Sequence, residues 1–524
     1  MRALILFVTV CATVTPALAQ PFANAKSSLA GYAVADTSPQ RSCDSLGSFT
    51  GARIASVKAR VVAATIDTPQ HCRVTGMITP EVAFEVSLPE RWNRRFFMTG
   101  NGGLAGDALD LPANADRSSA LENGFVHART NTGHDARREP RGSFILSDSQ
   151  KAIDYAYRAV HVTAETAKKI ANEYYGRAIA YSYWNSCSNG GRQGLLEAQR
   201  YPGDFDGVVA AAPWVDQTGF TVGAIWNQKA LAAAPVTPGK MALVARKVMG
   251  KCDALDGLRD GLIDDPRACR INVARDVPAC RGGTDDDTCL TAAQAAAIEK
   301  VYTGPMSKGK RFIAGFMPGS EAVTTDANGA LTSVWVGAIV PARSGAKPAD
   351  FNLAEGVMRY LVLDPPQPDY DTMTFDYDRA ASQVARWSRH ADAKQADLSA
   401  FRQSGGKLII TYGWADQTLQ PMMGVDYYER VGASNPKAQE FARLFMMPGV
   451  AHCRGGVGPD QYDAVTAVID WVEKGKTPDS LLASKLTNGA VVRTRPLCPY
   501  PQVARYKGHG SVDDAVNFSC VSLP

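Results

Sequence analysis

The sequence predicts an α/β protein whose mostly parallel sheet is interrupted by one long insertion. Apolar runs at 178–184 and 208–213 are typical of buried strands, and the pattern at 192–200 between them is that of a helix. This β-α-β order indicates parallel strands joined by a crossover helix. Strand patterns then stop and return only at 407–412 and 442–447. The two halves of the sheet are therefore expected to enclose an inserted domain.

Chain length and charge limit the domain organisation and the classes of partner that this protein can have. The 524 residues suffice for one large core at 20–213 and 401–524 that carries a lid domain at 214–400. Residues 20–64 have a mixed composition and are expected to wrap the surface. Lys and Arg number 56 against 52 for Asp and Glu, so no charge surplus indicates a nucleic acid or membrane partner.

The N-terminus has the features of a secretory signal peptide at 1–19. Arg2 precedes an apolar run at 3–14, and Ala17-Leu18-Ala19 matches the A-x-A pattern of a cleavage site. The run is too short to span a bilayer, and no later stretch has eighteen uninterrupted apolar residues. We therefore expect a secreted or periplasmic protein. The alternative is a buried or amphipathic N-terminal helix.

Ten cysteines remain once Cys11 of the signal is removed. An even number in an oxidising compartment indicates disulfides. Proximity in sequence favours short loops, although the sequence leaves the connectivity open. The candidate pairs are Cys252–Cys269, Cys280–Cys289, Cys498–Cys520 and Cys43–Cys72, which leaves Cys187 and Cys453 for each other.

Further strands are expected at 84–89, 94–100 and 125–130, with a helix over 151–175. The second of these strands runs directly into Gly100-Asn101-Gly102-Gly103. This loop has neither a Lys-Ser/Thr ending nor G-x-G-x-x-G spacing, which argues against nucleotide binding. In a hydrolase, a loop of this kind supplies backbone N–H groups to a developing oxyanion.

The strand at 178–184 leads into the turn Ser186-Cys187-Ser188-Asn189-Gly190, with Ser188 at its tip. In the G-x-S-x-G elbow of α/β hydrolases, small residues flank a strained serine because the strand and helix backbones nearly touch there. Ser186 stands in place of the first glycine, so the five-residue pattern alone is weak. The flanking strand and helix, together with Gly191, favour a nucleophile.

An α/β hydrolase places its nucleophile, acid and base after successive core strands in the chain order Ser, Asp, His. Ser188, Asp416 and His452 each follow an apolar strand in this order. His452 is expected to act as the base, Asp416 to orient it, and the backbone N–H groups of Asn189 and of Gly102 or Gly103 to hold the oxyanion. A lone Asp is more often a turn residue and a lone His more often a packed or surface residue, so the joint placement carries the prediction.

Two cysteines provide an independent check on this triad. Cys187 directly precedes Ser188, and Cys453 directly follows His452, so these thiols must be close if the serine and histidine meet. A disulfide there would preorganise the site. The rival interpretation, in which Cys187 is the nucleophile, is weakened by export and by the even cysteine count.

The stretch 252–266 crowds aspartates into a glycine-kinked loop. Such a loop suits Ca²⁺, which takes six to eight oxygen ligands, although the spacing is not that of an EF-hand. The alternative is a solvated acidic turn.

Taken together, the motifs resemble the tannase and feruloyl esterase family, which includes a hydrolase of mono(2-hydroxyethyl) terephthalate, over essentially the whole mature chain. The resemblance implies an α/β-hydrolase core with a large inserted lid, the Ser188–Asp416–His452 triad and an adjacent Cys187–Cys453 disulfide. It also implies a structural Ca²⁺ held by Asp253, Asp256 and Asp260 and by the carbonyls of Leu258 and Leu262. The motifs are Cys-Ser-Asn-Gly-Gly-Arg-Gln-Gly at 187–194, Gly-Asn-Gly-Gly at 100–103, Asp-Ala-Leu-Asp-Gly-Leu-Arg-Asp-Gly-Leu-Ile at 253–263, Tyr-Gly-Trp-Ala-Asp at 412–416 and Gly-Val-Ala-His-Cys at 449–453.

The resulting expectation is an exported serine carboxylesterase that hydrolyses esters of aromatic acids through an acyl-enzyme. Its partner would be a small feruloyl-type or galloyl-type ester, free or attached to plant polysaccharide or tannin. The alternative within the class is a terephthalate monoester hydrolase, but Gln417-Thr418-Leu419 lacks the aromatic residue expected of that specialist. The alternative of another class is a non-catalytic protein that binds aromatic ligands or carbohydrate.

Overall fold

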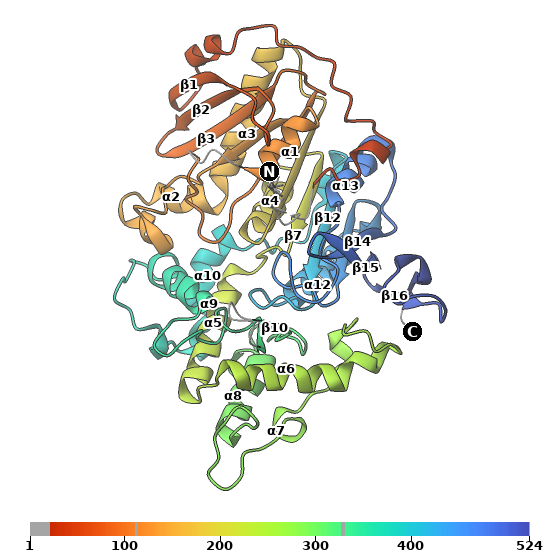
Figure 1. Ribbon diagram of the computed structural model, residues 1–524. Coiled ribbons are helices and arrows are strands. Elements are labelled where there is room, and N and C mark those ends of the chain that lie inside the picture. Colours follow the sequence, from red (N-terminus) through yellow and green to blue (C-terminus); the bar gives the residue numbers. More distant parts are fainter. Residues whose placement is uncertain (1–20, 110–113, 326–330, 523–524) are drawn as a thin grey trace, which may run out of the picture.

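The computed structural model describes residues 21–109, 114–325 and 331–522, so the predicted signal peptide at 1–19 lies outside the described residues. The centre of the protein is a nine-stranded sheet in the order β1-β2-β3-β5-β4-β6-β7-β12-β13 (Figure 1). The first three strands are antiparallel, and all pairs from β5 to β13 are parallel. The strands are β1 Ile54–Val62, β2 His71–Ile78, β3 Val82–Pro89, β4 Arg95–Thr99, β5 Val126–Thr130, β6 Tyr181–Cys187, β7 Gly207–Ala211, β12 Lys407–Gly413 and β13 Ala442–Met447.

Helices cover both faces of the parallel strands, which explains why these strands are apolar on both sides. Trp184 and Ile410 point into a core shared with α3, α4 and α12, whereas their neighbours Tyr183 and Ile409 pack on the opposite face with α13. The helices are α1 Ala115–Glu122, α2 Gln150–Ile153, α3 Ala159–Tyr175, α4 Asn189–Arg200, α5 Gln217–Ala233, α6 Pro238–Cys252, α7 Val273–Asp276, α8 Ala292–Thr303, α9 Ala349–Gly356, α10 Ala380–Ala391, α11 Ser399–Gln403, α12 Met422–Ser434 and α13 Ala464–Lys474.

The segment between β7 and β12 contains two packing regions. Buried apolar residues between Ala230 and Val340, many of them on α6, α7 and α8, form a separate hydrophobic core below the sheet in Figure 1. The start of α5 and the helices α9 and α10 instead share the main core under the sheet. Short hairpins complete this segment: β8 Met306–Ser307 with β9 Lys310–Arg311, and β10 Val323–Thr325 with β11 Leu331–Ser333.

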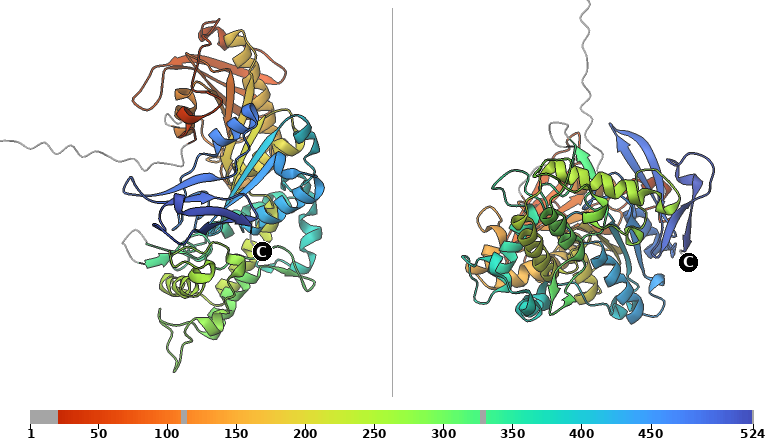
Figure 2. Two further views of the ribbon diagram at one scale, coloured as in Figure 1. Left: turned by 90° about the vertical axis from the view of Figure 1, so that its right-hand side faces the viewer. Right: turned by 90° about the horizontal axis from the view of Figure 1, so that it is seen from below.

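The N-terminal and C-terminal segments differ from the simple expectations for them. Phe22 and Tyr32 are buried against Phe97 and Phe125, and β1 forms the edge of the sheet, so 20–64 does more than wrap the surface. At the C-terminus, two hairpins lie at one side of the core (Figure 2). They are β14 Leu481–Thr487 with β15 Ala490–Leu497, and β16 Gln502–Tyr506 with β17 Phe518–Ser522.

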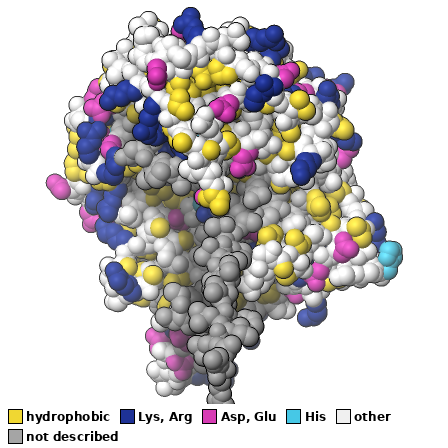
Figure 3. All heavy atoms as spheres, turned by 45° about the horizontal axis from the view of Figure 1, so that its top comes forward, with side chains coloured by type: hydrophobic (Ala, Val, Ile, Leu, Met, Phe, Trp, Pro, Cys, Tyr) yellow, Lys and Arg dark blue, Asp and Glu magenta, His cyan; other side chains and the backbone are white. Residues whose placement is uncertain are grey.

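The four disulfides suggested by proximity in sequence and the remaining pair, Cys187–Cys453, are all present, so this prediction is confirmed. Four of them close loops with sequence separations of 9 to 29 residues, and Cys187–Cys453 joins residues 266 apart. On the face shown in Figure 3, acidic and basic side chains are interspersed, as the nearly balanced charge predicts. In the part of the chain that the structure describes, no helix is both long and apolar enough to cross a membrane.

Candidate active site

Ser188 lies at the sharp turn between β6 and α4, where the sequence predicts an elbow. Its φ of +63° falls in the left-handed region, which a non-glycine residue adopts only under strain. A Cβ atom at Gly190 would lie 2.0 Å from the Ser186 Oγ, and one at Gly191 would lie 2.6 Å from the carbonyl oxygen of Ala211. Larger residues at either glycine would therefore push the helix away from the strand.

Ser188, Asp416 and His452 meet at the carboxyl edge of the parallel strands. The His452 Nε2 lies 2.9 Å from the Ser188 Oγ, and the His452 Nδ1 lies 2.8 Å from the Asp416 Oδ2. The other oxygen of the buried Asp416 accepts the backbone N–H groups of Thr418 and Leu419, at 2.9 and 2.8 Å. This carboxylate is thus fixed on one side and turned toward the imidazole on the other.

Two neighbouring contacts hold the histidine loop in place. The backbone N–H of His452 donates to the Gln417 Oε1 at 3.0 Å. The Cys187–Cys453 disulfide, with 5.9 Å between its Cα atoms, joins the residue before the serine to the residue after the histidine. The disulfide could be expected from the sequence, but the role of Gln417 could not, because no local pattern shows which backbone group a glutamine contacts.

The glycine loop at 100–103 packs against the start of α4. The Gln193 Oε1 accepts the backbone N–H of Asn101 at 3.0 Å, and the Asn101 side chain donates to the carbonyl oxygen of Thr130 at 2.8 Å. A Cβ atom at Gly100 would lie 2.8 Å from the Gly190 Cα. The loop with Gly102 and Gly103 and the backbone of Asn189 therefore lie on adjoining elements next to Ser188.

Tyr155 links these two elements, and sequence reasoning missed it. Its hydroxyl lies 3.2 Å from the carbonyl oxygen of Gly103 and 3.3 Å from the Asn189 Oδ1, and it accepts a hydrogen bond from the Gln217 Nε2 at 2.8 Å. Tyr155 belongs to a single π-helical turn, Asp154–Arg158, that interrupts the predicted helix. Such turns have no simple hydrophobic period, although they are frequent at functional sites.

The acidic loop turns its predicted ligand side chains toward its own backbone. The Asp253 Oδ1 accepts the N–H groups of Asp260 and Gly261, and the Asp256 Oδ1 accepts that of Leu258. Among the described residues, the carboxylates of Asp253, Asp256 and Asp260 do not form a set within 4.8 Å of one another.

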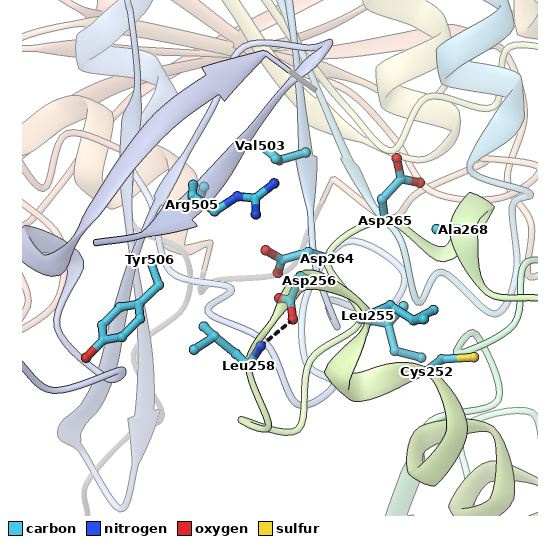
Figure 4. A pocket seen from close by; sticks show the side chains of 12 residues that line it. Cys252, Leu255, Asp256, Leu258, Asp264, Asp265, Ala268, Val503, Arg505 and Tyr506 are labelled. Carbon is cyan, nitrogen blue, oxygen red and sulfur yellow. Dashed lines mark hydrogen bonds between the residues drawn. The ribbon is translucent and has the colours of Figure 1, made fainter. Parts of the chain in front are cut away.

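Three residues outside the predicted ligand set border this loop. The Asp260 Oδ2 accepts a hydrogen bond from the Arg495 Nη2 at 2.6 Å. Figure 4 shows Asp264 beside Asp256, with Arg505 of β16 across the pocket. Burial, followed by the Asp256 carboxylate, raises the pKa of Asp264 to about 8. The surroundings of Asp264 therefore disfavour its charged form.

Comparison with known proteins bears on both the fold and the site. The family model "Tannase and feruloyl esterase" matches residues 65–521. The chain is 32% identical to mono(2-hydroxyethyl) terephthalate hydrolase of Piscinibacter sakaiensis, over 87% of this chain and 85% of that protein. It is 29% identical to feruloyl esterase B of Aspergillus niger, over 90% of each.

The solved structure of feruloyl esterase B from Aspergillus oryzae superimposes with a TM-score of 0.79 at 27% identity, covering 91% of this chain and 99% of that one. The α/β-hydrolase prediction is thereby confirmed. The family match spans most of the chain, and the relatives cover it almost from end to end. The chain belongs to the tannase and feruloyl esterase family and is a carboxylic ester hydrolase.

Proposed function

We propose that this enzyme hydrolyses esters of aromatic acids of the feruloyl or galloyl type, with Ser188 as its nucleophile. The observation that carries the proposal is the continuous chain of contacts from Ser188 through His452 to the buried Asp416, at 2.9 and 2.8 Å. The Ser188 hydroxyl is a weak nucleophile until a base accepts its proton, and His452 lies within reach to do so.

The reaction would run in two halves. Ser188 attacks the ester carbonyl while His452 takes its proton, and the protonated imidazole then returns that proton to the leaving alcohol. Water, activated by the same histidine, hydrolyses the acyl-enzyme. Asp416 keeps the Nδ1 proton of His452 in place and stabilises the imidazolium. Backbone N–H groups bind the second oxygen of Asp416 and so hold the carboxylate in this orientation.

The oxyanion that forms in each half needs hydrogen-bond donors already in position. Asn189 is the first residue of α4, and the first N–H groups of a helix have no partner within that helix. We assign the N–H of Asn189 and one from Gly102 or Gly103 to this role. Tyr155 would keep the two donor segments at a fixed separation, since its hydroxyl reaches both.

Replacing Tyr155 by phenylalanine is expected to lower kcat about tenfold with little change in KM. The loss should be smaller than the roughly 100-fold to 1000-fold cost of removing a direct oxyanion donor, because the hydroxyl acts through the backbone. Steady-state kinetics on one ester measure the effect. Tyr157→Phe, on the same π-helical turn but stacked against Arg200, is the matched control and should retain full kcat. Equal kinetics for the two variants would contradict the role of Tyr155.

The acyl group is tested by comparing methyl ferulate, methyl gallate and mono(2-hydroxyethyl) terephthalate at equal enzyme concentration. We expect one of the first two to have the highest kcat/KM. Gln417 supports this order, because its side chain is used to hold the backbone of His452 and presents no aromatic ring to a substrate. A preference for the terephthalate monoester would instead establish the alternative activity. Turnover of none of the three would refute the substrate class.

We further propose that the loop at 253–262 binds a structural Ca²⁺. Its donor set of three aspartates and two backbone carbonyls is all oxygen, as Ca²⁺ prefers. The position of Asp264 beside Asp256 (Figure 4) supports the proposal, because a divalent cation would stabilise carboxylates this close together. The carboxylates of Asp253, Asp256 and Asp260 would have to rotate inward, since they now accept backbone N–H groups.

Calcium should raise the thermal unfolding midpoint of the protein. A ligand at 100 times its Kd stabilises the folded state by about 2.7 kcal/mol, so the midpoint should climb over the concentration range that fills the site. Differential scanning calorimetry of chelator-treated protein, with and without added Ca²⁺, measures this shift. Asp256→Asn should abolish it, whereas Asp369→Asn, at an exposed site elsewhere in the lid, should leave it unchanged. An equal shift in both variants would rule out this loop.

We also propose that the protein is exported to the periplasm or the extracellular medium. The five disulfides support this, because such bonds persist in oxidising compartments. Cleavage of the signal after Ala19 would leave Gln20 as the first residue. Intact-mass measurement on exported protein tests this. A chain that retains Met1 and stays in the cytoplasm would refute it.

A further inference from the structure

Three potential metal ligands converge on the outer side of α4, away from the triad. His161 of α3, Glu197 of α4 and Asp204, in the turn before β7, each bring one ligand atom to within 4.8 Å of the other two. Within the described ranges, this is the one set of three His, Cys, Asp or Glu residues that meets this criterion. None of the three has a part in the proposed ester hydrolysis.

Glu197 gives the strongest indication that something binds there. Its side chain is 1% exposed, and its Oε2 has no hydrogen-bond partner among the described residues. A buried carboxylate oxygen without a partner is costly, and native structures rarely retain one without a reason. The carboxyl group of Asp204 lies next to it, with one oxygen within 4.8 Å of a Glu197 oxygen. Two carboxyl groups this close need either a shared proton or a cation between them.

His161 turns one ring nitrogen toward the two carboxyl groups. Its Nδ1 lies 2.6 Å from the Asp204 Oδ2, and its ring stacks on Tyr201 with 3.8 Å between centroids and 5° between planes. The opposite ring nitrogen, Nε2, lies 4.0 Å from the Glu165 carboxylate. The imidazole is 24% exposed, so a cation can enter and a water molecule can complete its shell.

Lys168 lies beside this set, and its ammonium group contacts a backbone carbonyl rather than a carboxylate. Its ammonium group donates to the backbone carbonyl of Asp204 and lies over the rings of Phe96 and Phe205. Asp204, Asp206, Glu197 and Glu165 all lie near this one lysine, so acidic groups outnumber it around the site.

We propose that His161, Glu197 and Asp204 form a binding site for one divalent transition-metal cation of the zinc type. One imidazole nitrogen and two carboxylates match Zn²⁺, whereas Ca²⁺ prefers oxygen ligands alone. Tetrahedral ligands at about 2.0–2.2 Å from Zn²⁺ lie roughly 3.3 Å apart. The 2.6 Å between His161 and Asp204 would therefore open by less than 1 Å. A bound cation would tie α3 to α4, the helix that begins at the elbow.

The test is a titration of tag-free, calcium-saturated protein with Co²⁺, a spectroscopic substitute for Zn²⁺. We expect one equivalent of Co²⁺ to bind with a visible d–d absorption band, and Zn²⁺ to displace it. Glu197→Gln, which preserves the shape of the side chain, and His161→Ala should each weaken binding by about 100-fold or more, since even outer-shell changes cost 10-fold to 100-fold. His509→Ala, at an exposed histidine, should bind as the wild type does.

Two results would overturn the site. Either calcium-saturated wild type binds no Co²⁺, or Glu197→Gln binds it as tightly as wild type while circular dichroism shows both to be folded. In either case the carboxyl groups of Glu197 and Asp204 share a proton and bind no metal. The Ser188→Ala variant should retain the Co²⁺ spectrum, which separates this site from the ester hydrolysis.

Discussion

Replacement of Ser188 by alanine is expected to lower kcat by about 10⁶-fold and to leave substrate binding nearly intact. The Ser188 Oγ is the atom that would form the acyl-enzyme, and the His452 Nε2 lies 2.9 Å from it. Without this oxygen, neither His452 nor the oxyanion donors have a covalent intermediate to stabilise. The remaining rate would be that of direct attack by water, accelerated only by substrate positioning and electrostatic stabilisation.

Steady-state hydrolysis of methyl ferulate or methyl gallate measures this loss, whichever of the two the wild type prefers. Ser186→Ala is the matched control, because Ser186 lies two residues earlier and its hydroxyl lies close to Gly190 rather than to His452. It should keep at least about a tenth of the wild-type kcat, since an exposed or packing hydroxyl contributes little to a transition state. Mass spectrometry after treatment with a serine-directed phosphonate should show one adduct in Ser186→Ala and none in Ser188→Ala. Substantial activity of Ser188→Ala would exclude Ser188 as the nucleophile.

The placement of Ser188, Asp416 and His452 could be predicted because it follows from the direction of the strands. Parallel strands end at the same edge of a sheet, so three polar residues that each follow an apolar strand must gather there. β6, β12 and β13 are buried on both faces and read as continuous apolar runs, which made their ends visible in the sequence.

Other parts of the fold depend on contacts that no local pattern records. β5 lies between β3 and β4 in the sheet, although β4 precedes β5 in the sequence. β1 is an exposed edge strand with few apolar side chains turned inward, so its sequence gave no clear strand period. Likewise, Tyr155 and Gln193 matter only because the fold brings them to Gly103 and Asn101.

The acidic loop shows why the residues around a metal site cannot all be predicted from the sequence. Spacing alone indicates a turn rich in aspartate, but Arg495 reaches Asp260 through tertiary packing across 235 residues of chain. The charge balance of the loop, and with it the case for a cation, can be judged only when such neighbours are known. The same holds for His161, Glu197 and Asp204, which come from two helices and a turn.

Removal of the Cys187–Cys453 disulfide, by changing both residues to alanine, is expected to lower both stability and activity. This bond closes a loop of 266 residues, for which the chain-entropy relation gives about 5.6 kcal/mol, an upper figure for the loss in free energy of unfolding. The bond also holds the elbow and the histidine loop together, and a misplacement of about 1 Å between reacting groups can cost 100-fold in rate. We therefore expect kcat to fall by about 100-fold even where the variant is fully folded.

The matched control is removal of Cys280–Cys289, which closes a loop of 9 residues in the lid, for which the same relation gives about 2.6 kcal/mol. This variant should unfold at lower denaturant than wild type but keep the wild-type kcat at 25 °C. Denaturant unfolding and kinetics on the same preparations separate the two effects. If the variant without Cys187–Cys453 loses stability yet keeps full kcat, the bond stabilises the fold without positioning His452 against Ser188, and the 2.9 Å contact must be maintained by Gln417 and Asp416 alone.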